Sequence, residues 1–131
     1  MSVYLRDVHT PDALRRMRAR RQIWLTPFHS VEIAHGIAQK VFRRDLSPGV
    51  ADKIYKQLAN DCDSGLWLLA DLPAFIFETA TELARKHVAT LGTRTLDTIH
   101  VASALELKAA QFWTFDDRQA KLAKAVGLKV S

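Results

Sequence analysis

The sequence predicts an α/β domain with a mostly parallel sheet. Short apolar segments alternate along the chain with amphipathic segments of helical period, and Ser/Thr-Pro pairs precede several of the helical ones. Strands that alternate with helices are typical of parallel α/β architecture. The chain has 131 residues, 48% of them hydrophobic and 25% charged, which predicts one globular domain over residues 1–131.

The first elements are predicted from a Pro-containing helix start and an apolar run. Thr10-Pro11-Asp12 begins a helix to about Arg20, with an acid in its first turn. Gln22–Thr26 is apolar and reads as a buried strand. Ser30 is expected to cap the next helix, whose core face would be Ala34, Ile37, Ala38 and Val41.

A Ser-Pro pair, similar to the Thr-Pro pair at residues 10–11, predicts the following helix. Ser47 is its expected N-cap, and Gly65 is its expected end. The predicted core face comprises Val50, Ile54, Leu58 and Cys62. Leu66–Leu72 then reads as a strand buried on both faces, as a parallel sheet requires.

The C-terminal part predicts three helices and two short strands. Pro73 is expected to open a helix to about His87, with Ile76, Ala80, Leu83 and Ala84 facing inward. The elements expected after it are a helix at Thr95–Ala109, a strand at Phe112–Phe115, a helix at Asp117–Val126 and a strand at Leu128–Ser131.

Basic residues are concentrated near the N-terminus. Residues 1–44 hold nine Lys and Arg against three acids, a net charge of +6 in a chain whose total is +5. Such an excess is typical of a surface that binds phosphate backbones. The alternatives are a solvated helix face or a surface for an acidic protein. The excess of positive charge lies mainly in Arg15, Arg16, Arg18, Arg20 and Arg21.

The single cysteine and the apolar runs bear on location. Cys62 has no partner for an internal disulfide, so the cytoplasm is the expected compartment. The thiol is expected to be a small buried apolar side chain rather than a catalytic group. No apolar run approaches the roughly 20 residues of a membrane-spanning helix. The first dozen residues lack the apolar segment of a secretory signal.

Several enzyme signatures are absent from the sequence. It contains no GxGxxG, no GK[ST] and no GxSxG. The five histidines lack a zinc-binding spacing such as HExxH, so they are expected to serve as hydrogen-bonded structural residues. Nucleotide folds of these types and serine hydrolases are thereby disfavoured.

Three carboxylates fall at equivalent positions of the predicted α/β pattern. Glu32 and Asp97 are expected in the first turns of helices, and Asp116 directly follows a predicted strand. In a parallel sheet these positions share one rim. Acids that converge there need a cation, and ligation by oxygen alone suits Mg²⁺ or Mn²⁺. The alternative is that each acid only complements a helix dipole.

Three segments form one recognisable pattern: Ser30-Val31-Glu32-Ile33, the run RTLDTIHVASAL from Arg94 to Leu105, and FWTFDDRQ from Phe112 to Gln119, followed by Leu122-Ala123 and Gly127–Val130. The pattern resembles PIN-domain proteins, and most of all the VapC-type toxin ribonucleases. The resemblance implies a three-layer α/β/α fold and a metal-dependent ribonuclease. It implies Glu32, Asp97 and Asp116 as catalytic, metal-binding carboxylates for Mg²⁺ or Mn²⁺, with Thr114 near them. Asp117 fits the motif less well.

The start of the chain departs from this pattern. Family members begin with a strand that ends in an Asp, whereas here Val3-Tyr4-Leu5 resembles the helix that follows it. The first strand is therefore expected to be missing, and the chain to begin late. The alternative is that residues 2–5 form the strand and that Asp7 replaces the family's first acid.

The resulting hypothesis is a PIN-type endoribonuclease, the toxin of a type II toxin–antitoxin pair. The implied partners are RNA and a cognate antitoxin protein, and a homo-oligomer is expected. Arg15, Arg16 and Arg20 are expected to bind the RNA. The alternative is a catalytically impaired PIN remnant that binds RNA or a protein partner. A receiver-like phospho-acceptor domain is disfavoured, since it needs paired acids after its first strand.

Overall fold

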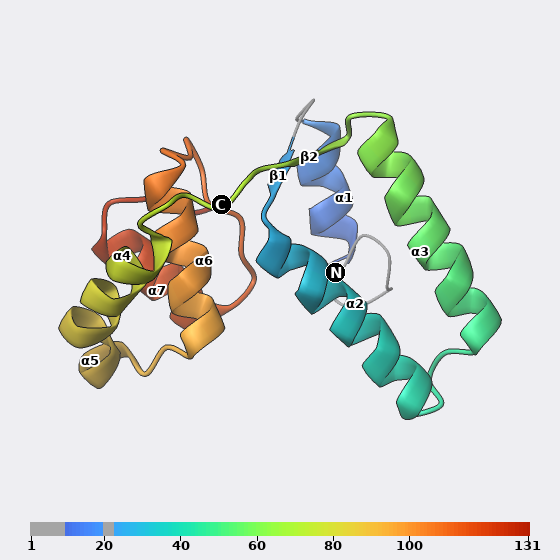
Figure 1. Ribbon diagram of the computed structural model, residues 1–131, viewed down its shortest axis with the longest axis horizontal. Coiled ribbons are helices and arrows are strands. Elements are labelled where there is room, and N and C mark those ends of the chain that lie inside the picture. The colour runs from blue at the N-terminus through green and yellow to red at the C-terminus, as the bar shows by residue number, and fades with distance from the viewer. Residues whose placement is uncertain (1–9, 20–22) are drawn as a thin grey trace. The chain divides into compact units, whose positions relative to one another are not determined.

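The computed structural model describes residues 10–19 and 23–131, and the chain divides into two compact units. Unit 1 is Met1–Asp71 and unit 2 is Leu72–Ser131. Figure 1 shows the chain in colours that run from blue in unit 1 to red at the end of unit 2. The prediction of one domain over residues 1–131 is not tested by this division and stays a prediction.

Within residues 10–19 and 23–71, unit 1 combines three helices with a two-stranded parallel sheet. Figure 1 shows these elements in colours from blue to green. Strand β1 pairs with β2 so that Trp24 lies opposite Leu68. The Ala70 N–H extends the ladder by donating to the Leu25 carbonyl at 2.8 Å. The elements are α1 (Thr10–Arg18), β1 (Ile23–Leu25), α2 (Pro27–Phe42), α3 (Pro48–Asp63) and β2 (Trp67–Leu69).

The two long helices of unit 1 begin at Pro residues. Thr26 caps α2, and its backbone N–H donates to Nδ1 of His29 at 3.0 Å. The predicted start at Ser30 was therefore wrong by one turn, because Thr-Pro is itself a helix start. The predicted cap of α3 is confirmed, since the Ser47 hydroxyl accepts from the Val50 N–H at 3.2 Å.

The core of unit 1 is formed by large side chains from both strands and both long helices. Its buried members are Leu25, Ile33, Ile37, Ala51 and Trp67. Cys62 packs against this cluster but is only partly buried, whereas a buried side chain was expected.

The predicted helix faces in unit 1 were partly wrong. On α2, Ala34 and Ala38 are exposed, whereas Ile33 and Ile37 are buried and Val41 packs against them. The branched residues bury more apolar area than the alanines, which turns the helix toward them. On α3, Val50 is exposed and the neighbouring Ala51 is buried instead.

The strands of unit 1 are shorter and more exposed than predicted. The expected strand Leu66–Leu72 is reduced to Trp67–Leu69, and the side chain of Leu69 is 65% exposed. Trp24 on β1 is also exposed. In β1 the exposed Trp24 is followed by the buried Leu25, whereas in β2 the buried Trp67 and the exposed Leu69 share one face. The expectation of burial on both faces is therefore wrong for the strand at Leu66–Leu72.

Unit 2 is mainly helical and is arranged around α6. Helix α6 contacts both α4 and α7, and Figure 1 shows these three helices grouped together in unit 2. The Thr79 hydroxyl on α4 donates to Oε1 of Glu106 on α6 at 2.5 Å. The elements are α4 (Ile76–Leu83), the π-helical turn η1 (Ala84–Val88), α5 (Ala89–Leu91), α6 (Thr95–Glu106) and α7 (Asp117–Ala125).

The helix expected from Pro73 to about His87 begins at Ile76, and the helical segment continues through η1 and α5 to Leu91. Ile76, Ala80 and Leu83 are buried, as predicted, while Ala84 is half-buried. The chain widens into the π-helical turn η1, which the sequence pattern did not predict. Gly92 ends the segment with a φ of +62°, a conformation that glycine adopts without strain.

Helix α6 is the buried centre of unit 2. His100, Val101, Ala102 and Ser103 are each at most 3% exposed. The predicted helix to Ala109 ends instead at Glu106. Small side chains on this helix let α4 and α7 approach it closely.

The two predicted C-terminal strands are reduced to one parallel bridge between Phe112 and Val130. The Phe112 N–H donates to the Lys129 carbonyl at 2.8 Å. Among the described residues, this bridge in unit 2 and the β1–β2 pair in unit 1 are the parallel pairings. The mixed α/β class is confirmed, whereas the three-layer arrangement stays a prediction. The expected missing strand, residues 2–5 and Val3-Tyr4-Leu5 lie outside the described residues.

Candidate functional site

Asp97 lies in the first turn of α6, as predicted. Its Oδ2 accepts from the backbone N–H of Arg94 at 3.2 Å, which satisfies one donor at the start of the helix. The side chain is only 12% exposed. A second contact reaches α7, where the side-chain nitrogen of Gln119 lies 3.4 Å from Asp97 Oδ1. Asp97 is therefore held between two helices of unit 2.

Asp116 is the N-cap of α7 rather than the last residue of a strand. Its Oδ1 accepts from the backbone N–H groups of Arg118 and Gln119 at 2.9 and 3.0 Å. The Gln119 hydrogen bond is the main cause that lowers the pKa of Asp116, helped by the Arg118 N–H and by the charges of Arg94 and Arg118, while burial opposes them. Asp116 is thus held as a carboxylate.

Arg94 joins the two acids. Its Nε lies 3.4 Å from Asp97 Oδ2, and its Nη2 lies 3.3 Å from Asp116 Oδ2. The two carboxylates come from different helices and face the same guanidinium. Arg94 begins the RTLDTIHVASAL segment, and no role was predicted for it; its position three residues before Asp97 was the available signal.

The atoms around this cluster fit a divalent cation. Two carboxylates already face one positive charge, and a hydroxyl oxygen lies beside one of them. The Thr114 hydroxyl accepts from the Asp116 N–H at 3.0 Å, which places Thr114 beside the cluster as the motif implied. Mg²⁺ is commonly held by one or two carboxylates together with water. Asp97 and Asp116 can therefore provide the protein part of such a site.

Glu32 belongs to unit 1, whereas Asp97 and Asp116 belong to unit 2. It lies in the second turn of α2, because that helix begins at Pro27, and not in the first turn as predicted. Within residues 10–19 and 23–131, no group of three or more His, Cys, Asp or Glu side chains is arranged to hold a metal. That Glu32 joins the two aspartates therefore stays a prediction, and Asp7 lies outside the described residues.

The N-terminal arginines are arranged around an acid. On α1, the Arg16 Nε lies 2.9 Å from Asp12 Oδ2, and Arg15 pairs with Asp12 Oδ1. The side chain of Arg15 is 79% exposed and that of Arg16 is 24% exposed. Arg20, the third predicted RNA-binding residue, lies outside the described residues.

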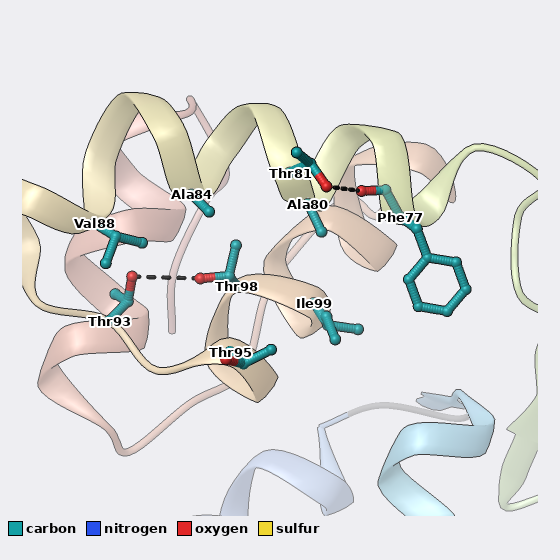
Figure 2. A pocket seen from close by; sticks show the side chains of 9 residues that line it. All are labelled: Phe77, Ala80, Thr81, Ala84, Val88, Thr93, Thr95, Thr98 and Ile99. Carbon is teal, nitrogen blue, oxygen red and sulfur yellow. Dashed lines mark hydrogen bonds between the residues drawn. The ribbon is translucent and has the colours of Figure 1, made fainter.

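Unit 2 also has a pocket of about 290 Å³ between the α4–η1 segment and α6 (Figure 2). In Figure 2 the hydroxyl groups of Thr93 and Thr98 face each other, 3.4 Å apart. The lining is Phe77, Ala80, Thr81, Ala84, Val88, Thr93, Thr95, Thr98 and Ile99. These side chains include no titratable group.

The cysteine offers no reactive thiolate. Burial, and then the charges of Asp63 and Asp61, raise the pKa of the Cys62 thiol, which keeps it protonated at neutral pH.

Among the helices that the structure describes, none has the length and apolar character needed to cross a membrane.

Comparison with known proteins gives one match. The family model of the PIN domain matches residues 2–125, which is nearly the whole chain. No curated protein and no solved structure matches the sequence significantly.

Proposed function

The chain belongs to the PIN domain family, a family of nucleases, and on that premise we propose that it is a metal-dependent endoribonuclease. More narrowly, we propose that it is the toxin of a type II toxin–antitoxin pair, of the VapC type that its motifs resemble. One observation carries the proposal at the level of chemistry: Asp97 and Asp116 face one shared cation, Arg94.

In this proposal the acids of unit 2 hold Mg²⁺ or Mn²⁺. Asp97 supplies a nearly buried carboxylate, and Asp116 supplies a carboxylate that backbone N–H groups keep ionised. Glu32 is the third proposed ligand. A bound divalent ion lowers the pKa of water and stabilises the leaving oxygen in phosphodiester cleavage. Thr114 and Gln119 orient Asp116 and Asp97 through the contacts described above.

RNA is the proposed substrate, and the basic residues of α1 are proposed to contact its phosphates. Arg15 is the most exposed of the described candidates. Arg16 is held against Asp12, which orients its guanidinium. Arg20 completes the proposed set on the basis of sequence alone.

The remaining parts of the proposal concern partners and location. A cognate antitoxin protein, a homo-oligomeric state and a cytoplasmic location follow from the resemblance and from the single cysteine. The exposed apolar side chains of unit 1, among them Trp24 and Leu69, are compatible with protein contacts.

Cleavage of RNA by the purified chain, with Mn²⁺ and with EDTA, tests the proposal. Asp97→Asn and Asp116→Asn should abolish Mn²⁺-dependent cleavage, because each removes a ligand charge while the amide oxygen can still accept the backbone hydrogen bonds. Asp117→Asn is the matched control, since Asp117 is adjacent, exposed and outside the cluster. Equal loss in Asp117→Asn, or cleavage that persists in EDTA, would contradict the proposed site.

A second candidate function is a PIN remnant that binds RNA or a protein without cleaving it. The observation that favours it is the same ion network, because Arg94 already balances part of the charge on Asp97 and Asp116. The assay separates the two functions. RNA binding without cleavage at any Mn²⁺ concentration supports the remnant, whereas cleavage that requires Asp97 supports the nuclease.

A further inference from the structure

The backbone of Arg94 is fixed while its side chain is exposed. The Arg94 carbonyl accepts from the Thr98 N–H at 3.0 Å and from the Thr98 hydroxyl at 3.2 Å, and the Arg94 N–H donates to Asp97. The side chain itself is 70% exposed, against 12% for Asp97 and 35% for Asp116. The guanidinium can therefore leave the acids by side-chain rotation, with no change in the main chain.

The contacts of the guanidinium are long for ion pairs. At 3.3 and 3.4 Å they exceed the 2.7–2.9 Å typical of charge-assisted N–H···O bonds. Exposed pairs of this kind contribute little to stability and are screened by salt. A divalent ion, by contrast, brings twice the charge to the same two carboxylates. The balance of charge therefore favours replacement of the guanidinium.

We propose that Arg94 is a built-in counter-ion that competes with the divalent metal for Asp97 and Asp116. Without metal, the guanidinium relieves the repulsion between the two carboxylates. When metal binds, the guanidinium leaves the carboxylates, because one cation at the shared position excludes the other. The inference rests on the proposed metal site, and it assigns Arg94 a positioning role rather than a catalytic one.

Direct binding of Mn²⁺ to the full chain, measured by calorimetry, tests the competition without any RNA. Arg94→Gln should bind Mn²⁺ about threefold to tenfold more tightly than the wild type, because no guanidinium has to be displaced. Arg94→Lys keeps the charge but not the two-pronged contact, and it should lie between them. Asp97→Asn should bind weakly and serves to assign the measured site.

Arg118→Gln is the matched control. Arg118 also lies near Asp116 and lowers the pKa of that carboxyl through its charge. The ion pairs described for Asp97 and Asp116, however, are made by Arg94. Arg118→Gln should therefore change the Mn²⁺ affinity less than about twofold. An equal gain in both variants would show a general field effect and overturn the specific role of Arg94.

A metal-free readout completes the test. In EDTA, Arg94→Gln should unfold at lower urea than the wild type, and saturating Mn²⁺ should restore it more than it stabilises the wild type. Mn²⁺ binding that needs Asp97 but is unchanged or weaker in Arg94→Gln would overturn the inference and leave the proposed metal site intact. No Mn²⁺ binding by the wild type or by Arg94→Gln would overturn both. Tighter binding in Arg94→Gln with no RNA cleavage would support the inference and count against the nuclease.

Discussion

The two units use opposite arrangements of charge. In unit 1, one acid is shared by two cations, since Asp12 pairs with both Arg15 and Arg16. In unit 2, one cation is shared by two acids, since Arg94 pairs with both Asp97 and Asp116. Each cluster has three ionised side chains, and each leaves one charge in excess.

The sign of that excess charge indicates what each cluster can attract. The cluster on α1 retains a positive charge, which favours an anion such as an RNA phosphate. The cluster at α6 and α7 retains a negative charge, which favours a cation. A nuclease that cleaves RNA with a divalent metal needs a site that attracts the phosphate backbone and a site that attracts the metal. The comparison therefore supports the proposed division of labour between RNA binding and metal binding.

The largest expected effects concern the cores of the two units. Ile37 in unit 1 and Leu122 in unit 2 are both fully buried. Ile37→Ala and Leu122→Ala should each lower the free energy of unfolding by about 2–5 kcal/mol, because each leaves a cavity. Urea denaturation followed by circular dichroism measures the change.

The same two variants test the prediction of one domain. If residues 1–131 unfold cooperatively, both variants shift a single transition by similar amounts. Two transitions, one shifted by Ile37→Ala and the other by Leu122→Ala, would contradict the one-domain prediction and establish the units as separate folding units.

The next prediction asks whether Glu32 of unit 1 shares the metal with the acids of unit 2. Glu32→Gln should weaken Mn²⁺ binding about tenfold or more, because a ligand charge is lost at constant size. Asp52→Asn, an exposed acid on α3 of the same unit, is the control and should leave the affinity within about twofold. Equal affinities of Glu32→Gln and the wild type would confine the metal site to unit 2.

Much of the local structure was predictable from the sequence. Short-range chemistry predicts the Ser47 cap, the inward face of Ile76, Ala80 and Leu83, and the end of α7 just before Gly127. The start of α2 was misplaced because two capping signals, Thr26 and Ser30, compete within one turn. Pro27 favours the earlier start, because its fixed φ suits the first position of a helix.

The positions of the proposed acids were only partly predictable, and their organisation was not. Asp97 was expected in the first turn of a helix, where it lies, whereas Asp116 was expected directly after a strand and is the N-cap of α7. Their roles as metal ligands stay predictions. Their link through Arg94 depends on how α6 and α7 pack, and a sequence does not contain that distance. The π-helical turn at Ala84–Val88 was missed for the same reason, since hydrophobic periodicity carries no signal for it.

A smaller effect is expected at the basic cluster of α1. Arg15→Gln should weaken binding to single-stranded RNA alike across sequences and lower the salt slope by roughly 0.7, the value for one lost phosphate contact. Lys53→Gln on α3 is the control for charge alone. Filter binding between about 50 and 200 mM salt measures the slope. An unchanged slope in Arg15→Gln would leave protein docking or solvation as the role of this cluster.

The smallest expected effect is the contribution of Asp116 to the pH dependence of stability. Backbone hydrogen bonds from Gln119 and Arg118, with the charges of Arg94 and Arg118, lower its pKa in the folded chain. The resulting stabilisation is present above the ordinary value of about 3.9 and is lost as pH falls through the lower folded pKa.

Asp116→Asn should therefore be less stable than the wild type at pH 7, by less than about 1 kcal/mol because the side chain is 35% exposed. The difference should shrink as the pH falls below the ordinary carboxyl value and should vanish once the wild-type carboxyl is protonated. Urea unfolding in EDTA at several pH values measures it, and Asp117→Asn should follow the wild type. A difference that stays constant from pH 7 to pH 2 would show that Asp116 stabilises α7 through the cap geometry and not through its charge.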